Sequence, residues 1–267
     1  FAINDYMDLA LQGDIYTNLS YALNITSSYV KRYKYSGSIE FRYEDNHTGL
    51  RNTPSYSSSN AFKFRWSHRQ DSKAHPHRSF SANVNLVSSK FNQYTTNLSD
   101  YFNNTTTSSI AFSTKLGSYW NLTANLGESY NVNTGAISLD LPSVSVSTTQ
   151  IYPFRKKKKQ GKNKWYEDIS ISYRVNMINK IDTYDSLLTS PDIFKSFRNG
   201  IIHSLPIQSN VKILKHLNWT NSIDYTERWY SNSISKTYNP ETDLIDKDTV
   251  YGFIANRNAN FKSSLNT

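Results

Sequence analysis

The sequence contains no cysteine, so it offers neither a disulfide framework nor a thiolate metal site. It has no apolar run near the roughly 18 residues that a transmembrane helix requires, and it has no signal peptide. The chain opens at Phe1 in the middle of a pattern and stops at NFKSSLNT, as an excerpt of a longer protein would. The missing targeting signals therefore exclude little.

Recognisable active-site motifs are also missing. There is no G-x-S-x-G, no H-E-x-x-H and no P-loop. S-x-x-K occurs in a chain rich in both residues, and a period of two would place its Ser and Lys on opposite faces. His68, His75 and His77 have no carboxylate or cysteine at ligand spacing. The sequence predicts no enzyme, no cofactor and no metal site.

A low apolar content is combined with many aromatic residues. Hydrophobic residues make up 37% of the chain and aromatic residues 14%, with 20 Tyr and 13 Phe. Disordered chains are poor in aromatic residues, and a large globular core needs more aliphatic ones. The combination favours β-structure in which one face of each strand is apolar. The net charge of +9 fits nucleic acid, anionic lipid or simple solubility.

Strict alternation of apolar and polar residues is the strongest signal. In SIEFRYE, the residues Ile39, Phe41 and Tyr43 share one face of a strand, and charged residues occupy the other. The same pattern recurs in NAFKFRWSHR, SFSANVNLVSS, YWNLTANLGES and DISISYRVNM. Many runs reach ten residues, whereas ordinary strands average about 5–6. Long strands with one apolar and one polar face are typical of transmembrane β-barrels.

The length of each expected connection depends on whether it follows an odd-numbered or an even-numbered strand. We expect strands near residues 1–11, 19–31, 34–46, 59–70, 78–90, 105–116, 119–131, 136–150, 165–179, 199–213, 217–231 and 249–265. Long connections follow odd-numbered strands, at 46–58, 91–104, 181–198 and 232–248. Outer-membrane barrels likewise alternate long outer loops with short periplasmic turns. The sequence therefore predicts an all-β fold, an antiparallel transmembrane β-barrel with about 12 of its strands in this chain.

Tyr and Trp gather near the ends of the expected strands. The residues are Tyr33, Tyr35, Trp120, Trp165, Tyr166, Trp229 and Tyr230. An aromatic girdle at a membrane interface would place them there. The alternative is an ordinary aromatic core.

A basic run lies between Pro153 and Trp165, after an even-numbered strand. It consists of Arg155, Lys156, Lys157, Lys158 and Lys159. A nucleic-acid site would need an aromatic platform or an inserting helix beside it, and neither is evident. We therefore expect a solvated periplasmic turn and no nucleic-acid partner. Contact with anionic head groups is the alternative.

Three long stretches carry a family resemblance: FAINDYMDLALQGDIYTNLSYAL, RWSHRQDSKAHPHRSFSANVNL and LDLPSVSVSTTQIYPFRKKKKQGKNKWYEDISISY. They resemble the LptD-type lipopolysaccharide-assembly proteins of the outer membrane, in particular those of the Bacteroidetes group. NGIIHSLPIQSNVKILKHL and YTERWY continue the resemblance in the same order, so it covers nearly the whole chain.

The resemblance implies a translocon subunit that inserts lipopolysaccharide into the outer leaflet of the bacterial outer membrane. The implied partners are lipopolysaccharide, an LptE-like lipoprotein that plugs the lumen, a periplasmic bridge protein and membrane lipids. Residues 1–267 would form the N-terminal portion of the barrel. A periplasmic β-jellyroll upstream and the strands that close the barrel would lie outside this chain.

In such proteins the lipid leaves through a lateral gate between the first and last strands, while the sugars cross the lumen. By resemblance FAINDYMDLALQGDIY is the first strand, so Asp5, Met7, Asp8 and Leu9 are the candidate gate residues. Some members weaken this seam with proline, but the segment from Phe1 to Tyr33 has none. Asp5 and Asp8 would weaken the seam instead, or are simply surface charges.

Two short stretches, Asp185-Ser186-Leu187 and Asp248-Thr249-Val250, resemble the O-glycosylation pattern of Bacteroidetes. They lie in or beside predicted outer loops, which makes Ser186 and Thr249 candidate modification sites. Triplets of this kind also arise by chance.

Two other functions remain open at this point. A passive outer-membrane channel for solutes or fatty acids would show the same strand pattern. A soluble, basic, β-rich module that binds polysaccharide or nucleic acid would share the composition and the charge.

Overall fold

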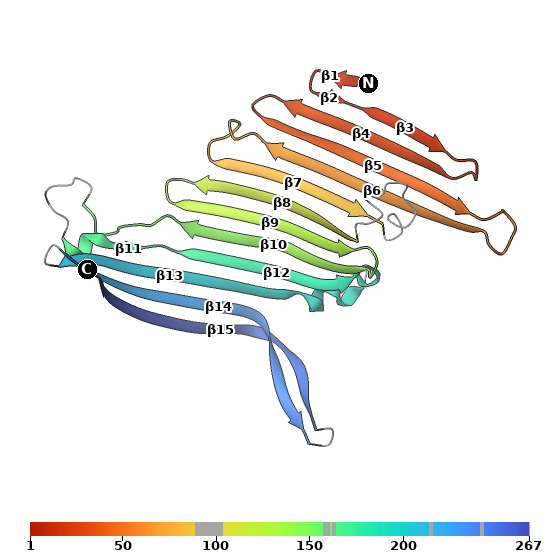
Figure 1. The fold of residues 1–267 in the computed structure, drawn as a ribbon. Helices are drawn as coiled ribbons and strands as arrows, with labels where there is room; N and C mark the ends of the chain where they lie inside the picture. The colour runs from red at the N-terminus through yellow and green to blue at the C-terminus, as the bar shows by residue number, and fades with distance from the viewer. Residues whose placement is uncertain are drawn as a thin grey trace. The chain divides into compact units, whose positions relative to one another are not determined.

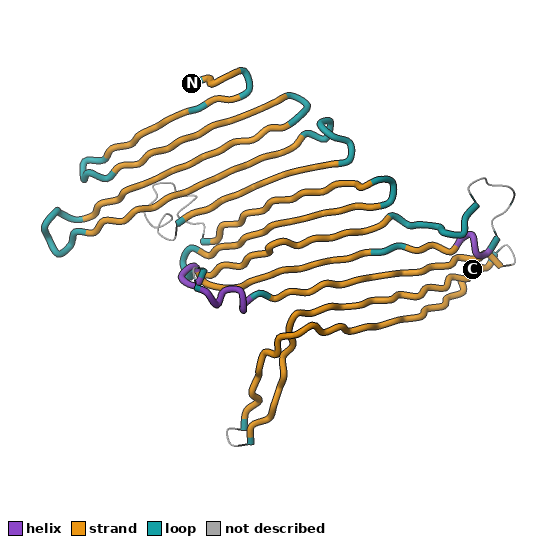
Figure 2. The backbone as a smooth tube through the Cα atoms, turned by 180° about the vertical axis from the view of Figure 1, so that it is seen from behind, coloured by secondary structure: helices purple, strands orange, loops and turns teal. Residues whose placement is uncertain are grey.

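The structure is a computed structural model. It describes residues 1–88, 104–156, 161, 164–188, 190–213, 216–240 and 243–266, and at residues 192, 194 and 195 it describes the backbone alone. Almost all of this part of the chain is strand, and helix is confined to short 3-10 turns, as Figure 2 shows. No helix in these ranges is long and apolar enough to cross a membrane.

The strands are antiparallel and pair in nearly the order in which they follow along the chain (Figure 1). Within the described residues they are β1 (Ala2–Asn4), β2 (Met7–Asp8), β3 (Ala10–Ile15), β4 (Tyr21–Lys31), β5 (Tyr35–Thr48), β6 (Ser57–Gln70), β7 (Arg78–Val87), β8 (Thr105–Leu116), β9 (Trp120–Asn131), β10 (Ala136–Thr148), β11 (Ile169–Ile171), β12 (Arg174–Tyr184), β13 (Arg198–Ile213), β14 (Leu217–Asn239) and β15 (Leu244–Asn266). The 3-10 turns are η1 (Trp165–Asp168), η2 (Asp185–Leu187) and η3 (Pro191–Ser196). The pairing order is β1-β2-β4-β5-β6-β7-β8-β9-β10-β12-β13-β14-β15, with β3 beside β4 and β11 beside β13.

The chain divides into two compact units. The first contains Phe1–Ser113, Asn125–Leu141 and Lys180–Phe197, and the second contains Thr114–Ala124, Pro142–Asn179 and Arg198–Thr267. In the first unit a small core forms around Tyr130, Val132 and Ile137. Most other large apolar side chains of the described residues keep part of their surface exposed. The strands therefore do not rest on a large protein core.

The expected alternation is confirmed by the register of the strands. Phe41 of β5 lies opposite Phe64 of β6, and Phe64 lies opposite Leu86 of β7. One residue along, Arg65 lies opposite Asn85. Because successive side chains point to opposite faces, apolar and polar residues gather on separate faces of these strands. The prediction of an all-β antiparallel fold is confirmed.

The prediction of one strand over residues 1–11 is wrong in detail, because the chain forms three short strands there, β1, β2 and β3. Asp5 and Tyr6 form a turn in which the Asn4 side chain accepts a hydrogen bond from the Tyr6 amide at 2.9 Å. Asn and Asp favour such turns, and this one folds β1 back onto β2. After Leu9 the chain re-enters the sheet as β3.

The expected strand at 165–179 is also divided. The Glu167 side chain accepts a hydrogen bond from the Lys164 amide at 2.8 Å and starts η1 instead of a strand. The strand that follows is split into β11 and β12. These two divisions account for the difference between about 12 expected strands and the 15 observed.

The prediction of a long loop at 232–248 is wrong for most of that range. Ladder pairs continue from Asn232 opposite Tyr251 to Asn239 opposite Leu244. Polar residues and Pro240 indicated a loop in the sequence, but backbone pairing between two neighbouring strands does not depend on apolar side chains. β14 and β15 thus form one long hairpin, visible in blue in Figure 1.

Candidate functional site: strands with one apolar face

The first unit presents an exposed apolar face. Leu23 of β4, Phe62 of β6 and Leu86 of β7 are 41%, 44% and 38% exposed, respectively. Leu11 of β3, opposite Ile25 of β4, extends this face to the next strand and is 57% exposed. Soluble monomers rarely expose large contiguous apolar patches. The face needs an apolar neighbour.

A cluster of aromatic rings closes this face at the end of β4, near the β4–β5 turn. The Tyr29 hydroxyl lies 2.8 Å from Nδ1 of His68 and accepts a hydrogen bond from the Trp66 indole N–H at 2.9 Å. Tyr29 reaches these residues of β6 by crossing β5 at Gly37, where a Cβ atom would clash with the Tyr29 hydroxyl. Tyr35 stacks on His68, with 5.7 Å between ring centroids.

A second group of rings lies toward the other end of the same strands. The rings of Tyr21 and Tyr43 are 6.3 Å apart, and those of His47 and Tyr56 are 5.8 Å apart. Tyr35, Tyr43 and His47 share one face of β5. With a rise of about 3.3 Å per residue and a tilt of about 40°, Tyr43 and His47 lie roughly 20 Å and 30 Å from Tyr35 along a bilayer normal. This spacing matches an apolar band of about 25 Å.

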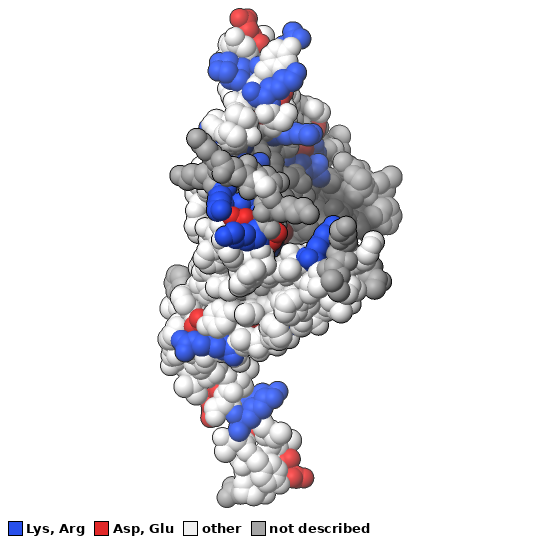
Figure 3. Space-filling model, turned by 90° about the vertical axis from the view of Figure 1, so that its left-hand side faces the viewer, with Lys and Arg blue, Asp and Glu red and all other residues white. Residues whose placement is uncertain are grey.

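The opposite face of the first unit is charged. Arg42 forms an ion pair with Glu44 at 2.6 Å and approaches Asp14 at 4.0 Å, and Arg65 approaches Glu40 at 3.9 Å. Figure 3 shows from one side how charged side chains form small groups between wide uncharged areas. A face of this kind suits water rather than hydrocarbon.

The second unit repeats the two-faced pattern, with one exception. Ile207, Ile223 and Phe261 lie opposite one another on β13, β14 and β15. On the same face, Glu227 pairs with Arg257 at 3.1 Å, and Arg257 remains 69% exposed. This ion pair lies on the face that also carries Ile207, Ile223 and Phe261.

Hydrogen bonds hold that carboxylate in place. Glu227 also accepts hydrogen bonds from the Tyr225 hydroxyl at 2.7 Å and from the Trp229 indole at 2.9 Å. The His203 ring lies 4.1 Å from the Trp229 ring, and its Nδ1 lies 2.8 Å from the Tyr173 hydroxyl. Such a network suits the level of polar head groups, where a charge costs far less than in the hydrocarbon centre.

The structure places the four candidate gate residues at the first strands of the first unit. Asp5 lies in the β1–β2 turn, and Met7 lies opposite Tyr29 of β4. The Asp8 carboxylate accepts a hydrogen bond from the Ser28 amide at 2.7 Å. Leu9 exchanges backbone hydrogen bonds with Phe1 at 2.7 and 2.8 Å. The exposed Asp8 thus links the segment to β4.

The sequence matches a known protein family along its whole length. A family model described as LptD protein matches residues 1–267. The chain belongs to this family. It is therefore an LptD-type protein, which indicates a role in lipopolysaccharide transport and assembly. The LptD family consists of transport and assembly proteins rather than enzymes. No curated protein matches the chain significantly.

In this LptD-type protein the basic run is partly paired. Arg155 lies 3.3 Å from Asp168, and Lys156 lies 3.9 Å from Glu167. The Arg155 guanidinium also lies 3.6 Å from the centre of the Tyr152 ring. Lys157, Lys158 and Lys159 lie outside the described residues.

The two candidate modification sites have different surroundings. Ser186 lies exposed in η2, and its amide donates to the Asp185 carboxylate at 2.6 Å. Thr249 is exposed but lies within β15, opposite Ile234. Ser186 has the local geometry of an accessible turn, whereas Thr249 belongs to a strand ladder.

Among the described residues, His68, His75 and His77 do not gather with other potential metal ligands. His68 belongs to the aromatic cluster, and His75 and His77 lie in the β6–β7 turn with 6.3 Å between their rings. No group of three or more potential ligand side chains occurs among the residues that the structure describes.

The sequence analysis missed two features of the apolar faces. One is the crossing of Tyr29 over Gly37, and the other is the Glu227–Arg257 pair. A glycine inside an alternating strand was the available signal for the first, since such a glycine marks a close approach. For the second, Glu227 and Arg257 each interrupt an apolar period, but the sequence does not reveal that they lie opposite each other.

Proposed function

We propose that this chain forms part of an outer-membrane β-barrel that inserts lipopolysaccharide into the outer leaflet through a lateral gate. The observation that carries the proposal is the exposed apolar face of the first unit, bounded by Tyr29 and Tyr35 at one end and by Tyr43 at the other. Family membership implies that the transported substrate is lipopolysaccharide.

The physical chemistry of a bilayer supports the barrel. In hydrocarbon every backbone N–H and C=O needs an internal partner, so spanning strands must close on themselves. Here β1 and β15 are the two ends of the pairing order in the described residues. Strands outside this chain would complete the barrel and join these two ends.

The gate is proposed at the first strands. β1 and β2 contribute three and two residues, and β3 pairs with β4 alone among the described strands. Opening a seam breaks backbone hydrogen bonds that hydrocarbon cannot replace. A short and interrupted first strand reduces the number of bonds that must break, and it does so without proline. The Asp8 carboxylate links this segment to its neighbour β4. The gate would therefore open at the opposite edge of the segment, toward the strand that closes the complete barrel.

The partners follow from the family and the two faces. The charged face around Arg42 and Glu44 would line a wet lumen, where an LptE-like lipoprotein and the sugars of lipopolysaccharide would be accommodated. The basic turn at Arg155 would lie on the periplasmic side, where a bridge protein delivers the substrate. The family gives no support to a passive channel.

Depletion in cells tests this function. When the gene is shut off, lipopolysaccharide should disappear from the surface and accumulate inside, and the wild-type gene should restore it. The readout is surface lipopolysaccharide measured by labelling intact cells, with uptake of a small hydrophilic solute measured in parallel. If depletion lowered solute uptake and left surface lipopolysaccharide unchanged, the proposal would be wrong.

A further inference from the structure

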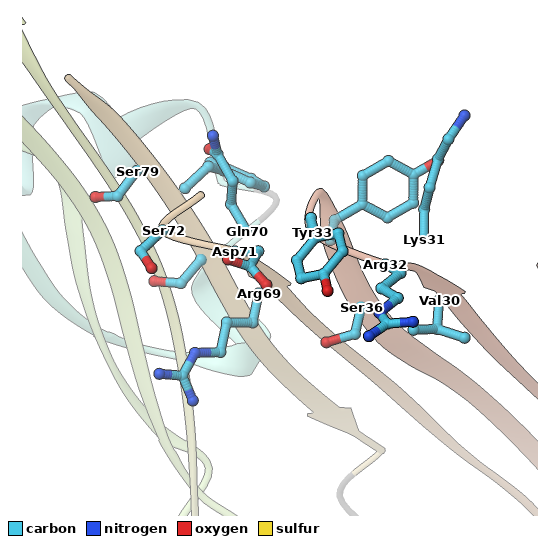
Figure 4. A pocket seen from close by; sticks show the side chains of 13 residues that line it. Val30, Lys31, Arg32, Tyr33, Ser36, Arg69, Gln70, Asp71, Ser72 and Ser79 are labelled. Atoms are coloured by element: carbon cyan, nitrogen blue, oxygen red, sulfur yellow. The ribbon is translucent and has the colours of Figure 1, made fainter. Parts of the chain in front are cut away.

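The first unit contains a pocket at the strand ends that carry the Tyr29 cluster. Its volume is about 690 Å³, and it lies between the β4–β5 turn and the β6–β7 turn (Figure 4). The two turns are joined by a backbone hydrogen bond of 2.9 Å from the Asp71 amide to the Lys34 carbonyl. The walls of the pocket are thus fixed to each other.

Basic side chains line this pocket. Arg32 and Arg69 contribute guanidinium groups, and neither forms an ion pair within the described residues. Arg32 lies over the Tyr33 ring at 4.8 Å, and Lys73 lies over the same ring at 4.9 Å. Two positive charges therefore lie beside the Tyr33 ring, and of these Arg32 belongs to the lining of the pocket.

Hydroxyl groups accompany the guanidinium groups. Arg69 lies opposite Ser36 of β5 on one side and opposite Ser81 of β7 on the other, so these three side chains share the polar face. Ser72 and Tyr33 belong to the same lining and add two more hydroxyl groups (Figure 4). Guanidinium and hydroxyl groups together form the donor set that phosphate oxygens accept.

The one acid of the lining is already engaged. The Asp71 carboxylate accepts a hydrogen bond from the Lys73 amide at 2.8 Å and thereby stabilises the β6–β7 turn. It would repel an anion in the pocket, but it is outnumbered by Lys31, Arg32 and Arg69 in the same lining.

We propose that this pocket binds a phosphate group on the head group of an anionic glycolipid. This inference deepens the proposed function and rests on it, because it assigns the glycolipid a contact at the level of the aromatic rings. Phosphate oxygens would accept hydrogen bonds from Arg69 and Arg32, with Ser36 as a further donor. Ser36, Arg69 and Ser81 lie on the polar face that would line the lumen. They lie at the strand ends whose short turns would be periplasmic, so the head group would be bound as the glycolipid enters the barrel.

Binding to the purified full chain in a maltoside detergent and phosphate-free buffer tests the proposal. The probe is lipid A with two phosphates, compared with the same lipid after enzymatic dephosphorylation and with inorganic phosphate. Arg69→Gln should weaken the Kd for phosphorylated lipid A about tenfold or more, as expected for loss of charged hydrogen bonds. Asp71→Asn, which keeps the side-chain acceptor, should tighten it. Neither variant should change binding of the dephosphorylated lipid.

Arg51→Gln is the matched control, because Arg51 is an exposed arginine in the connection between β5 and β6, at the other end of these strands. Equal affinity of the wild type and Arg69→Gln would overturn the proposal, as would an equal loss in Arg51→Gln. Inorganic phosphate binding as tightly as the lipid would overturn the assignment to a head group. The assay uses purified protein, so its failure leaves the depletion test of the proposed function untouched.

Discussion

The hydroxyl of Tyr29 and Nδ1 of His68 lie 2.8 Å apart, although a whole strand separates the residues that carry them. The contact exists because Gly37 of β5 has no side chain to block the tyrosine ring. Trp66 adds a hydrogen bond to the same hydroxyl at 2.9 Å. One glycine thus allows β4 and β6 to form a polar contact across β5, at the edge of an apolar face.

The first prediction concerns this crossing. Gly37→Ala should destabilise the protein by about 1–3 kcal/mol, because the added methyl group would clash with Tyr29 and with the carbonyl oxygen of Ser67. Gly13→Ala is the control, since a Cβ atom there has no neighbour within 4 Å. Urea unfolding of both variants in lipid vesicles provides the comparison. Equal stability of the two variants would argue against the crossing.

The second prediction concerns the two faces. Val84→Arg should cost about 2–4 kcal/mol of stability in lipid, because Val84 lies opposite Trp66 on the apolar face. Asn85→Arg should be mild, because Asn85 lies on the polar face, where Arg65 donates to it at 3.3 Å. Ile171→Arg extends the test to the second unit, with an expected loss like that of Val84→Arg. The same penalty at positions 84 and 85 would reject the assignment of faces.

The third prediction concerns the basic run. Replacing Lys156, Lys157, Lys158 and Lys159 with serine should leave folding and membrane insertion intact. The pair of Lys156 with Glu167 is 3.9 Å long and its lysine is 61% exposed, and exposed pairs contribute about 0–1 kcal/mol. The check is the yield of folded protein in outer-membrane fractions. Salt-dependent nucleic-acid binding that this variant abolished would show that the run is more than a solvated turn.

The fourth prediction concerns glycosylation. Ser186 is exposed in η2, so native protein should carry a sugar there, and Ser186→Ala should lower its intact mass by one glycan. Thr249 lies in a strand ladder and is expected to be a poorer acceptor. Intact mass spectrometry of protein from its own host decides the matter. A mass equal to that of the bare chain excludes both sites.

Much of the fold could be predicted because it follows from period-two alternation. The register that places Ile25 opposite Phe41 follows from the apolar pattern and the short turn between β4 and β5. The break at Asp5 and the start of η1 at Lys164 depend on single side-chain hydrogen bonds to the backbone, which alternation does not encode. The long β14–β15 hairpin was missed because its ladder continues through polar residues.

The functional contacts were harder to predict because they join distant strands. The Glu227–Arg257 pair depends on the register between β14 and β15, and the pocket at Arg69 depends on two turns held side by side. The sequence shows these residues as isolated charges. Only the pairing of strands brings them together.

The most direct test of the account locks the proposed gate. One cysteine replaces Gln12 on β3, and a second is placed opposite it on the strand that closes the complete barrel. Oxidation should block the appearance of new lipopolysaccharide at the cell surface, and reductant should restore it. A disulfide between cysteines at positions 64 and 86, which lie opposite each other on β6 and β7, is the control and should be tolerated. Normal surface lipopolysaccharide with the gate fully oxidised would contradict lateral insertion at the first strands.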